Sequence, residues 1–380
     1  RLRRELNELS SSLLRLIETI LKLAERNIET PMPLFTHIQH AQIGTFGHYL
    51  LAQVDILMRD FDRLDECYCR VNLSPLGGCA IGGSSFELDR KRTADILGFD
   101  GVVENSLDAV SSRDVVLEAA AIISILMADL SRMAEDLILW STPEFGYIEL
   151  SDEYSSTSSA MPQKKNPCTL ELIRGKTGGV YGSLFSLLTT MKGLASGYNR
   201  DLQETKPPIW RCVDEAKGCV DVLEGVIGTM LVRRERMLGV SSESYALAWD
   251  LAEGLVKETG LSFRESHAVV GEVVKDALSS GLTVREITGE LIEAAAEKVL
   301  GKKIKVDQRV VNTYLDPISS LKQRKTLGSP SPEEVSRMLK RRRGELKERE
   351  GKLNKRVKKV EKARGELEKK VKGYISGRGR

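Results

Sequence analysis

Residues 113–140 read RDVVLEAAAIISILMADLSRMAEDLILW, a long and unusually apolar stretch in a chain of 380 residues. Its apolar side chains recur at helical spacing, among them Val116, Ala120, Ile123, Met127, Leu130, Met133 and Leu137. A helix that is apolar around most of its circumference is stable only when other elements surround it. The stretch therefore predicts the central helix of a bundle.

Long helical patterns flank this stretch on both sides, while alternating strand patterns bounded by turn residues are almost missing. The patterns cover residues up to about 26, 50–70, 168–192 and 207–238. We therefore expect an all-α protein whose residues 1–239 form a long-helix bundle. Shorter helical patterns at 244–259, 262–279 and 284–296 predict a small C-terminal helical domain over 240–335.

A basic helical extension is expected over residues 336–380, as a short coiled coil or as a solvated arm. From 337 to 380 there are 19 basic and 6 acidic residues, although the whole chain has a formal charge of only +3. Such a charge excess raises nucleic acid as a partner. A solvated charged helix is the simpler interpretation, so we expect no nucleic-acid binding.

Composition and residue spacing argue against a membrane protein, a secreted protein and a metal-binding protein. No apolar run reaches the roughly 20 residues that a membrane helix needs, and no signal peptide precedes the first helix. The six cysteines are scattered and form no CxxC pair, which indicates a reduced, cytoplasmic protein without a zinc site. His37 and His40 could share one helical face as metal ligands, but no nearby carboxylate or thiol completes the set, so no metal is expected.

Three polar segments could carry chemistry. The first, Thr36-His37-Ile-Gln39, follows a proline-rich elbow; a polar helix start is the alternative interpretation. The second runs from Ser155 to Pro167; it could be a linker, but a loop of small residues can also close over a substrate and deliver a hydroxyl. The third, 198–206, reads YNRDLQETK and suits an amino-acid ligand, although a solvated turn is also possible.

The loop sequence 157–167, TSSAMPQKKNP, resembles the signature of the fumarase/aspartase superfamily. Within that superfamily the chain is similar to the argininosuccinate lyase family, from its start to about residue 335. The similarity rests on several motifs in one order: THIQ (36–39), VNLSPLG (71–77), NSLDAV (105–110), ELIRGK (171–176) and YNRDLQE (198–204).

This resemblance implies β-elimination of argininosuccinate to arginine and fumarate, the last step of arginine biosynthesis, without a cofactor. It also implies a homotetramer with a twenty-helix core, in which three subunits contribute to each active site. Ser159 matches the loop serine that acts as general base, and His37 with Glu171 matches the pair on the acid side. Lys164 and Asn166 would hold the carboxylate that takes up charge.

Five further positions match residues that contact substrate in the family: Thr36, Arg90, Tyr198, Gln203 and Lys206. The chain also departs from the family pattern. Thr157 replaces a glycine, and His40 and Gly44 stand where arginine and proline are expected. Family members carry on the order of a hundred more residues at the front, so we expect one substrate-binding segment and most of an N-terminal domain to be missing.

Two alternatives remain open at this point. The chain could be another fumarate-releasing lyase, such as an adenylosuccinate lyase or an aspartase. It could also be a non-catalytic structural homologue, because the front segment is missing. We expect the basic extension beyond about residue 340 to lie outside the family resemblance.

Overall fold

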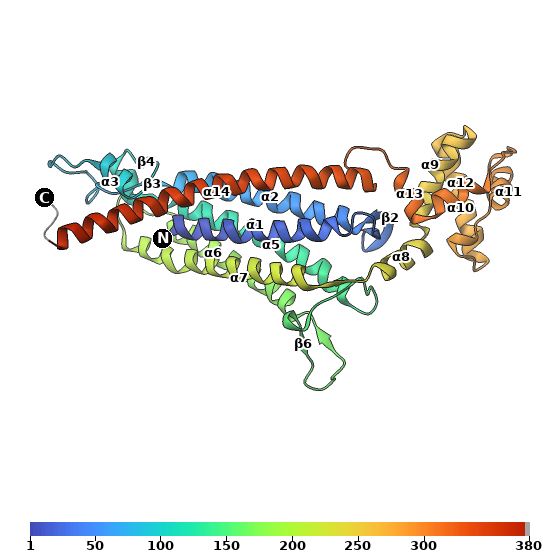
Figure 1. Ribbon diagram of the computed structural model, residues 1–380, viewed down its shortest axis with the longest axis horizontal. Helices are drawn as coiled ribbons and strands as arrows, with labels where there is room; N and C mark the ends of the chain where they lie inside the picture. The colour runs from blue at the N-terminus through green and yellow to red at the C-terminus, as the bar shows by residue number, and fades with distance from the viewer. Residues whose placement is uncertain (377–380) are drawn as a thin grey trace.

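The computed structural model describes residues 1–376, and five long helices form its body (Figure 1). They run up and down the bundle in alternation, joined by loops at its two ends. Their bounds are α1 (Leu2–Glu25), α2 (Phe46–Val71), α5 (Asp114–Ser141), α6 (Cys168–Met191) and α7 (Lys206–Thr229). The expectation of a long-helix bundle is confirmed.

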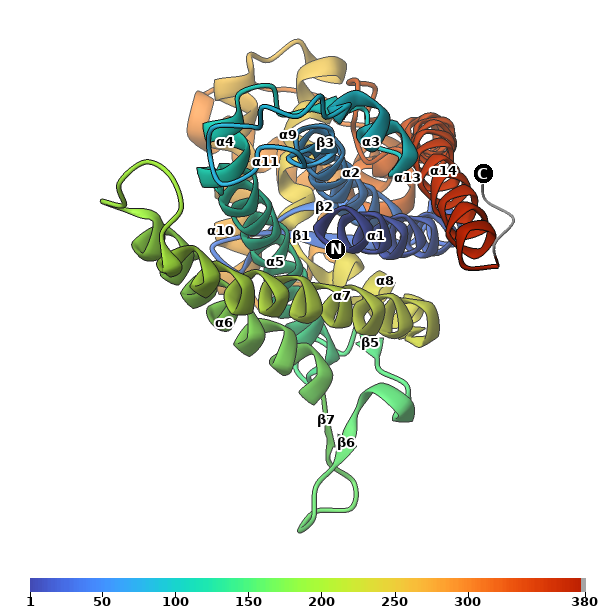
Figure 2. The same cartoon turned by 90° about the vertical axis from the view of Figure 1, so that its left-hand side faces the viewer.

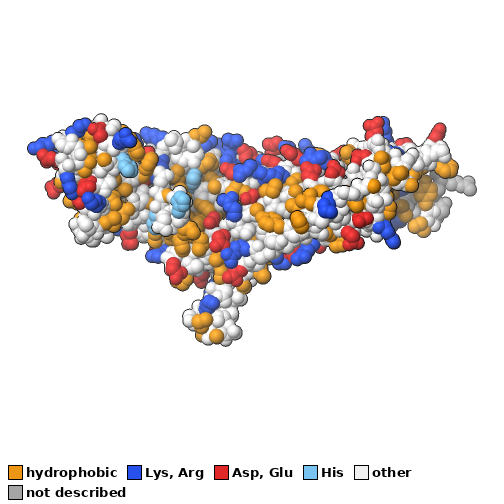
Figure 3. Space-filling model, turned by 180° about the vertical axis from the view of Figure 1, so that it is seen from behind, with side chains coloured by type: hydrophobic (Ala, Val, Ile, Leu, Met, Phe, Trp, Pro, Cys, Tyr) orange, Lys and Arg blue, Asp and Glu red, His pale blue; other side chains and the backbone are white. Residues whose placement is uncertain are grey.

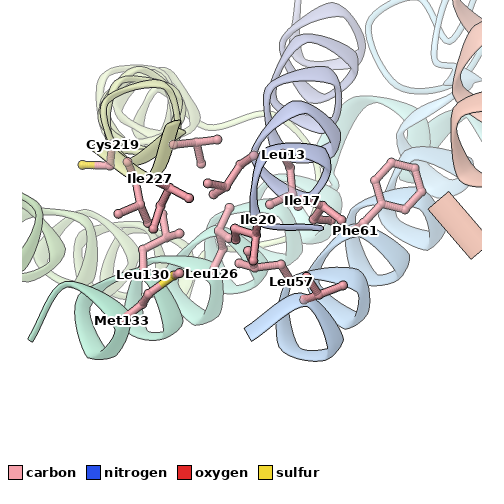
Figure 4. Close-up of a cluster of buried hydrophobic side chains, with 14 of the residues drawn as sticks. Leu13, Ile17, Ile20, Leu57, Phe61, Leu126, Leu130, Met133, Cys219 and Ile227 are labelled. Carbon is pink, nitrogen blue, oxygen red and sulfur yellow. The ribbon is translucent and has the colours of Figure 1, made fainter. Parts of the chain in front are cut away.

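Helix α5 lies in the middle of this bundle, packed against α2, α6 and α7. Its side chains Leu126, Leu130 and Met133 meet apolar side chains of α1, α2 and α7 in one continuous core (Figure 4). Ala120 and Ile123 are fully buried as well. Complete burial of such side chains stabilises the fold by about 1.5–3 kcal/mol each for the larger ones, which explains why this stretch is apolar almost all round.

The helical interpretation of the segment that holds His37 is wrong, because the segment is a β-hairpin. Strand β1 (Pro31–Thr36) pairs antiparallel with β2 (Gln39–Thr45). Two prolines at positions 31 and 33 lack the N–H groups that a helix interior requires. Both residues of the two-residue turn, His37 and Ile38, have positive φ, at 53° and 59°, as a type I′ hairpin turn demands.

A small helical domain with its own apolar core lies at one end of the bundle (Figure 1). It comprises α9 (Ala248–Thr259), α10 (Phe263–Ser279), α11 (Gly289–Leu300), α12 (Gln308–Leu315) and α13 (Pro317–Lys322), and α8 (Arg234–Glu243) connects it to the bundle. Ile43 of β2 is buried in this core, so the hairpin joins the two domains. A buried ion pair between Arg324 and Asp250, at 2.8 Å, adds a polar link inside the domain.

Of the two forms expected for the basic extension, the solvated arm is wrong over most of its length, because the extension packs helix to helix, as in a coiled coil. Helix α14 (Pro332–Ile375) packs along α1 and α2. Val335, Leu339, Leu346 and Leu353 belong to the core of the bundle. Residues 377–380 of the expected extension lie outside the described residues.

The segments between the long helices contain short helices and strands. At the end of the bundle remote from the small domain lie β3 (Leu73–Ser74), α3 (Arg90–Ile96), β4 (Gly101–Val102) and α4 (Ser106–Ser111). The loop before α6 holds β5 (Ile148–Glu149), which pairs with β8 (Leu231–Val232), and the ribbon of β6 (Ser156–Thr157) and β7 (Lys165–Asn166). Along residues 1–376, none of the helices combines the length and the hydropathy of a membrane span.

Asp60 of α2 introduces a pH dependence into the bundle. Its side chain is fully buried; this burial, together with the charge of Asp129, raises the pKa of the Asp60 carboxyl to about 7, against a partial offset from Arg63. The folded state thus binds a proton that the unfolded state releases near pH 4. The contribution of Asp60 to stability should therefore fall as pH rises from about 4 to 7, and stay level above it.

Replacing Asp60 with asparagine keeps an acceptor for Arg63, which donates to Asp60 Oδ1 at 2.8 Å, and removes the buried charge. We expect the variant to be more stable than the parent at pH 8 by about 2 kcal/mol, and the gain to vanish at pH 4. Thermal unfolding at the two pH values measures this. An equal shift at both would contradict the role of ionisation.

Candidate active site

The residues singled out in the sequence fall into two groups at opposite ends of the bundle. His37 lies on the hairpin and Ser159 on the loop before α6, both toward the small domain (Figure 1). Tyr198, on the loop between α6 and α7, and Arg90, the first residue of α3, lie at the other end. Helix α6, with 24 residues, separates the two ends by about 36 Å. One chain alone therefore cannot bring all candidate residues around one small substrate.

His37 occupies the tip of the hairpin, where its side chain is exposed together with that of Thr36. Non-glycine residues seldom adopt positive φ, and such residues often mark functional sites. No hydrogen bond from the His37 ring to any residue of the described chain is present. The imidazole is therefore exposed and unpaired within the described residues.

Residues behind the tip fix the hairpin to the small domain. His40 Nδ1 lies 3.0 Å from Ser244 Oγ, and the His40 ring meets the Phe35 ring edge-on at 5.2 Å. Partial burial of the ring lowers the pKa of His40. A cavity of about 820 Å³ opens here between the hairpin, α8 and the small domain. Histidine side chains gather over this part of the surface (Figure 3).

The serine-rich loop distinguishes two neighbouring hydroxyls. Ser158 Oγ accepts hydrogen bonds from the backbone N–H groups of Ala160 and Met161, at 3.3 and 3.2 Å. Ser159 is exposed, and its hydroxyl has no hydrogen-bond partner within residues 1–376. The loop stands well away from the bundle (Figure 2). Ser158 thus shapes the turn, and the Ser159 hydroxyl is the one available for chemistry.

The two lysines of this loop also differ. Lys165 Nζ contacts Asp152 at 2.8 Å and Glu149 at 3.4 Å, and the bond to Asp152 raises the pKa of Lys165. Lys164 is exposed and forms no ion pair in the part of the chain that is described. Asn166 follows on β7, half-buried, at the base of the loop. Local sequence does not show that one lysine of the pair anchors the loop, because the acidic partners lie 13 and 16 residues away.

Glu171 lies in the first turn of α6, exposed, directly after the loop. No hydrogen bond joins it to His37 among the described residues, so the expected pair does not form inside one chain.

At the remote end, Arg90 holds a loop together. Its guanidinium donates to the carbonyl groups of Leu76, Val103 and Glu104, at 3.0, 2.7 and 2.9 Å. Five N–H groups exist on a guanidinium, so two remain for a ligand. This structural use of Arg90 cannot be predicted from the sequence, because the three acceptors are backbone carbonyl groups, which every residue has.

The 198–206 segment lies at the same end. Gln203 Nε2 donates to the Tyr198 hydroxyl at 2.7 Å, and both side chains are exposed. Lys206, at the start of α7, is exposed as well. A Cβ added to Gly197 would lie 3.9 Å from Ile81, which places this segment against the loop that Arg90 holds. These polar groups together offer a cation, a phenol and an amide to a charged small molecule.

Comparison with known families and proteins identifies the family of the chain independently of the site geometry. A family profile described as "Lyase" matches residues 1–182, and one described as "Argininosuccinate lyase C-terminal" matches residues 245–322. The chain is 47% identical over 348 residues to argininosuccinate lyase of Methanosarcina mazei, covering 91% of this chain and 70% of the relative. With that of Nitrosopumilus maritimus it shares 45% over 342 residues, covering 89% and 69%.

Comparison with solved structures supports the same family assignment. EDDS lyase in complex with formate superposes with a TM-score of 0.93 at 32% identity, covering 99% of this chain and 75% of that one. A 3-carboxy-cis,cis-muconate lactonizing enzyme from Pseudomonas putida superposes at 0.72 and 20% identity, covering 90% and 73%, which shows a shared fold only. The chain is thus a carbon–nitrogen lyase of the fumarase/aspartase superfamily, and it belongs to the argininosuccinate lyase family.

Proposed function

We propose that the protein splits argininosuccinate into arginine and fumarate, with the free hydroxyl of Ser159 as the general base. The difference between Ser159 and its neighbour Ser158 is the observation that carries this assignment, because only one of the two hydroxyls is free. Ser159 would take the proton from the carbon next to a carboxylate. The C–N bond then breaks, and its electron pair leaves with the nitrogen of arginine.

The remaining residues have matching tasks. A serine hydroxyl is a weak base, so its pKa must fall, and the exposed ammonium of Lys164 on the same loop would favour the alkoxide. Lys164 and Asn166 would hold the carboxylate that gains charge in the intermediate. His37 would protonate the departing nitrogen, oriented by Glu171. Thr36, Arg90, Tyr198, Gln203 and Lys206 would bind the substrate.

We propose a homotetramer with active sites shared between subunits. The apolar outer face of α5 and α6 supports this: Leu172 and Phe185 are 59% and 72% exposed, and Ile125, Tyr181 and Leu188 accompany them. Large exposed apolar patches mark association surfaces. Antiparallel packing of copies through this face would bring the hairpin end of one chain near the remote end of another. Such packing would bring the two groups of candidate residues together.

A cytoplasmic location, no membrane partner and no cofactor belong to the same proposal. All six cysteines are free in the described chain, and three of them are buried, as suits a reducing compartment.

The test is fumarate absorbance after addition of argininosuccinate to the purified chain, with adenylosuccinate and aspartate as parallel substrates. Fumarate from argininosuccinate alone supports the proposal. Fumarate from another substrate would favour a different superfamily lyase, an option kept open because an EDDS lyase variant has been solved with bound fumarate. A folded tetramer that releases none from any substrate would leave the non-catalytic homologue.

A further inference from the structure

Helix α14 connects the two ends of the molecule. It begins beside the small domain, where His48 Nε2 donates to the Gly328 carbonyl at 3.0 Å and Glu334 accepts from the Gly328 N–H at 2.9 Å. It then runs the length of α1 and α2 and ends beyond α3 (Figure 1). A 44-residue helix of this kind is a rigid link of about 66 Å.

Two seven-residue repeats join α14 to the bundle. Leu339, Leu346 and Leu353 are each only 5% exposed and face the core. Arginines repeat at the same interval and form ion pairs with α2: Arg342 with Asp55, Arg349 with Asp62 and Arg356 with Asp65. This is the pattern by which helices of a coiled coil fix their register. Three of the nineteen basic residues of 337–380 are therefore paired with acidic groups of α2.

The far third of α14 contacts the turn after α3. Lys359 forms an ion pair with Asp100. Gly98 has φ of +69°, and a Cβ added to it would lie 2.8 Å from the Ala363 Cβ, so glycine is required both for the turn and for the approach of α14. From the other side, Arg3 of α1 donates to the Gly98 carbonyl at 2.9 Å. The turn around Gly98 therefore lies between α14 and α1 and contacts both.

The turn around Gly98 is connected through the backbone to the groups that hold Arg90. The backbone from Gly98 leads to Val103 and Glu104, whose carbonyl groups accept from the Arg90 guanidinium. Asp100 also accepts from Asn72 Nδ2 at 2.6 Å, at the start of the same loop. A shift of α14 would therefore move the acceptors that orient Arg90.

We propose that α14 is a strap that positions the Arg90 loop, residues 73–104, and that Lys359 is a positioning residue for substrate binding. The kinetic part of this inference rests on the proposed function, since it takes Arg90 as a substrate contact. Loss of the Lys359–Asp100 contact would loosen the loop, raise KM and leave the proton-transfer groups on the hairpin and serine loop unchanged.

Charge reversal tests the strap. Lys359→Glu places a negative charge against Asp100, whereas Lys358→Glu makes the same change at an exposed neighbour without an ion pair in the described chain. For Lys359→Glu we expect KM to rise about three- to fivefold with kcat within about twofold, and faster amide hydrogen exchange across residues 86–99. Lys358→Glu should change neither. Asp100→Lys combined with Lys359→Glu should recover the part of both effects that the ion pair carries, while the hydrogen bond from Asn72 to Asp100 stays lost.

Each outcome has one meaning. Equal exchange and equal KM for the two single variants would overturn the strap. Faster exchange at unchanged KM would overturn its role in substrate binding. If the parent chain produces no fumarate, the proposed function fails, and the exchange measurement still decides whether α14 holds the loop.

Discussion

Ser159→Ala is expected to lower kcat for fumarate release from argininosuccinate by about a thousandfold, the contribution typical of a positioned proton acceptor. Its hydroxyl is exposed and free of partners in the described chain, so removal leaves no buried group unpaired. The fold should therefore be unchanged, and KM should stay within a few-fold. Steady-state kinetics with circular dichroism as a check on folding measure the two effects separately.

Ser158→Ala is the matched control one residue away. It removes the acceptor of two backbone N–H groups, so the loop loses about 1 kcal/mol per hydrogen bond and kcat should fall far less than in Ser159→Ala. If Ser158→Ala were the more damaging change, the assignment of the base to Ser159 would be wrong.

Mixing two inactive variants should restore activity. Ser159 and Lys206 lie near opposite ends of the bundle, so in the proposed tetramer one active site takes them from different chains. Ser159→Ala and Lys206→Ala, unfolded and refolded together in equal amounts, should then give about a quarter of the parent activity, since random assembly leaves that share of sites intact.

The control is the double variant, with both changes in one chain, refolded with itself or with either single variant. None of these mixtures contains an intact site if two chains supply the residues, so none should gain activity. No recovery in the first mixture, despite mixed tetramers by native mass spectrometry, would show that each site is built within one chain.

The sequence by itself determined the bundle and the family. The apolar stretch 113–140 has one stable solution, burial among other helices, because the hydrophobic effect depends on which residues are apolar and at what spacing. The motif 157–167 located the serine loop, because the chemistry of a short segment is carried by residue types in order. Neither conclusion needs contacts between distant segments.

Other features were decided by tertiary structure. The hairpin at 31–45 escaped prediction because burial does not alternate along either strand: it falls steadily from Pro31 to Thr36 and rises steadily from Gln39 to Thr45. Helix α14 looked solvated because its apolar positions are sparse. Those few positions are buried against the bundle, and its arginines pair with Asp55, Asp62 and Asp65, which are 287 to 291 residues away in sequence.

The roles of the candidate site residues also depend partly on local sequence and partly on tertiary structure. That Lys165 anchors the loop while Lys164 is free, and that Arg90 holds three carbonyl groups, depends on partners that only folding brings near. Local sequence determines which groups are present and the local shape of the chain. Ion pairs and hydrogen bonds to backbone carbonyl groups between distant segments require the two partners to be close in space. The partners become close only when the bundle folds.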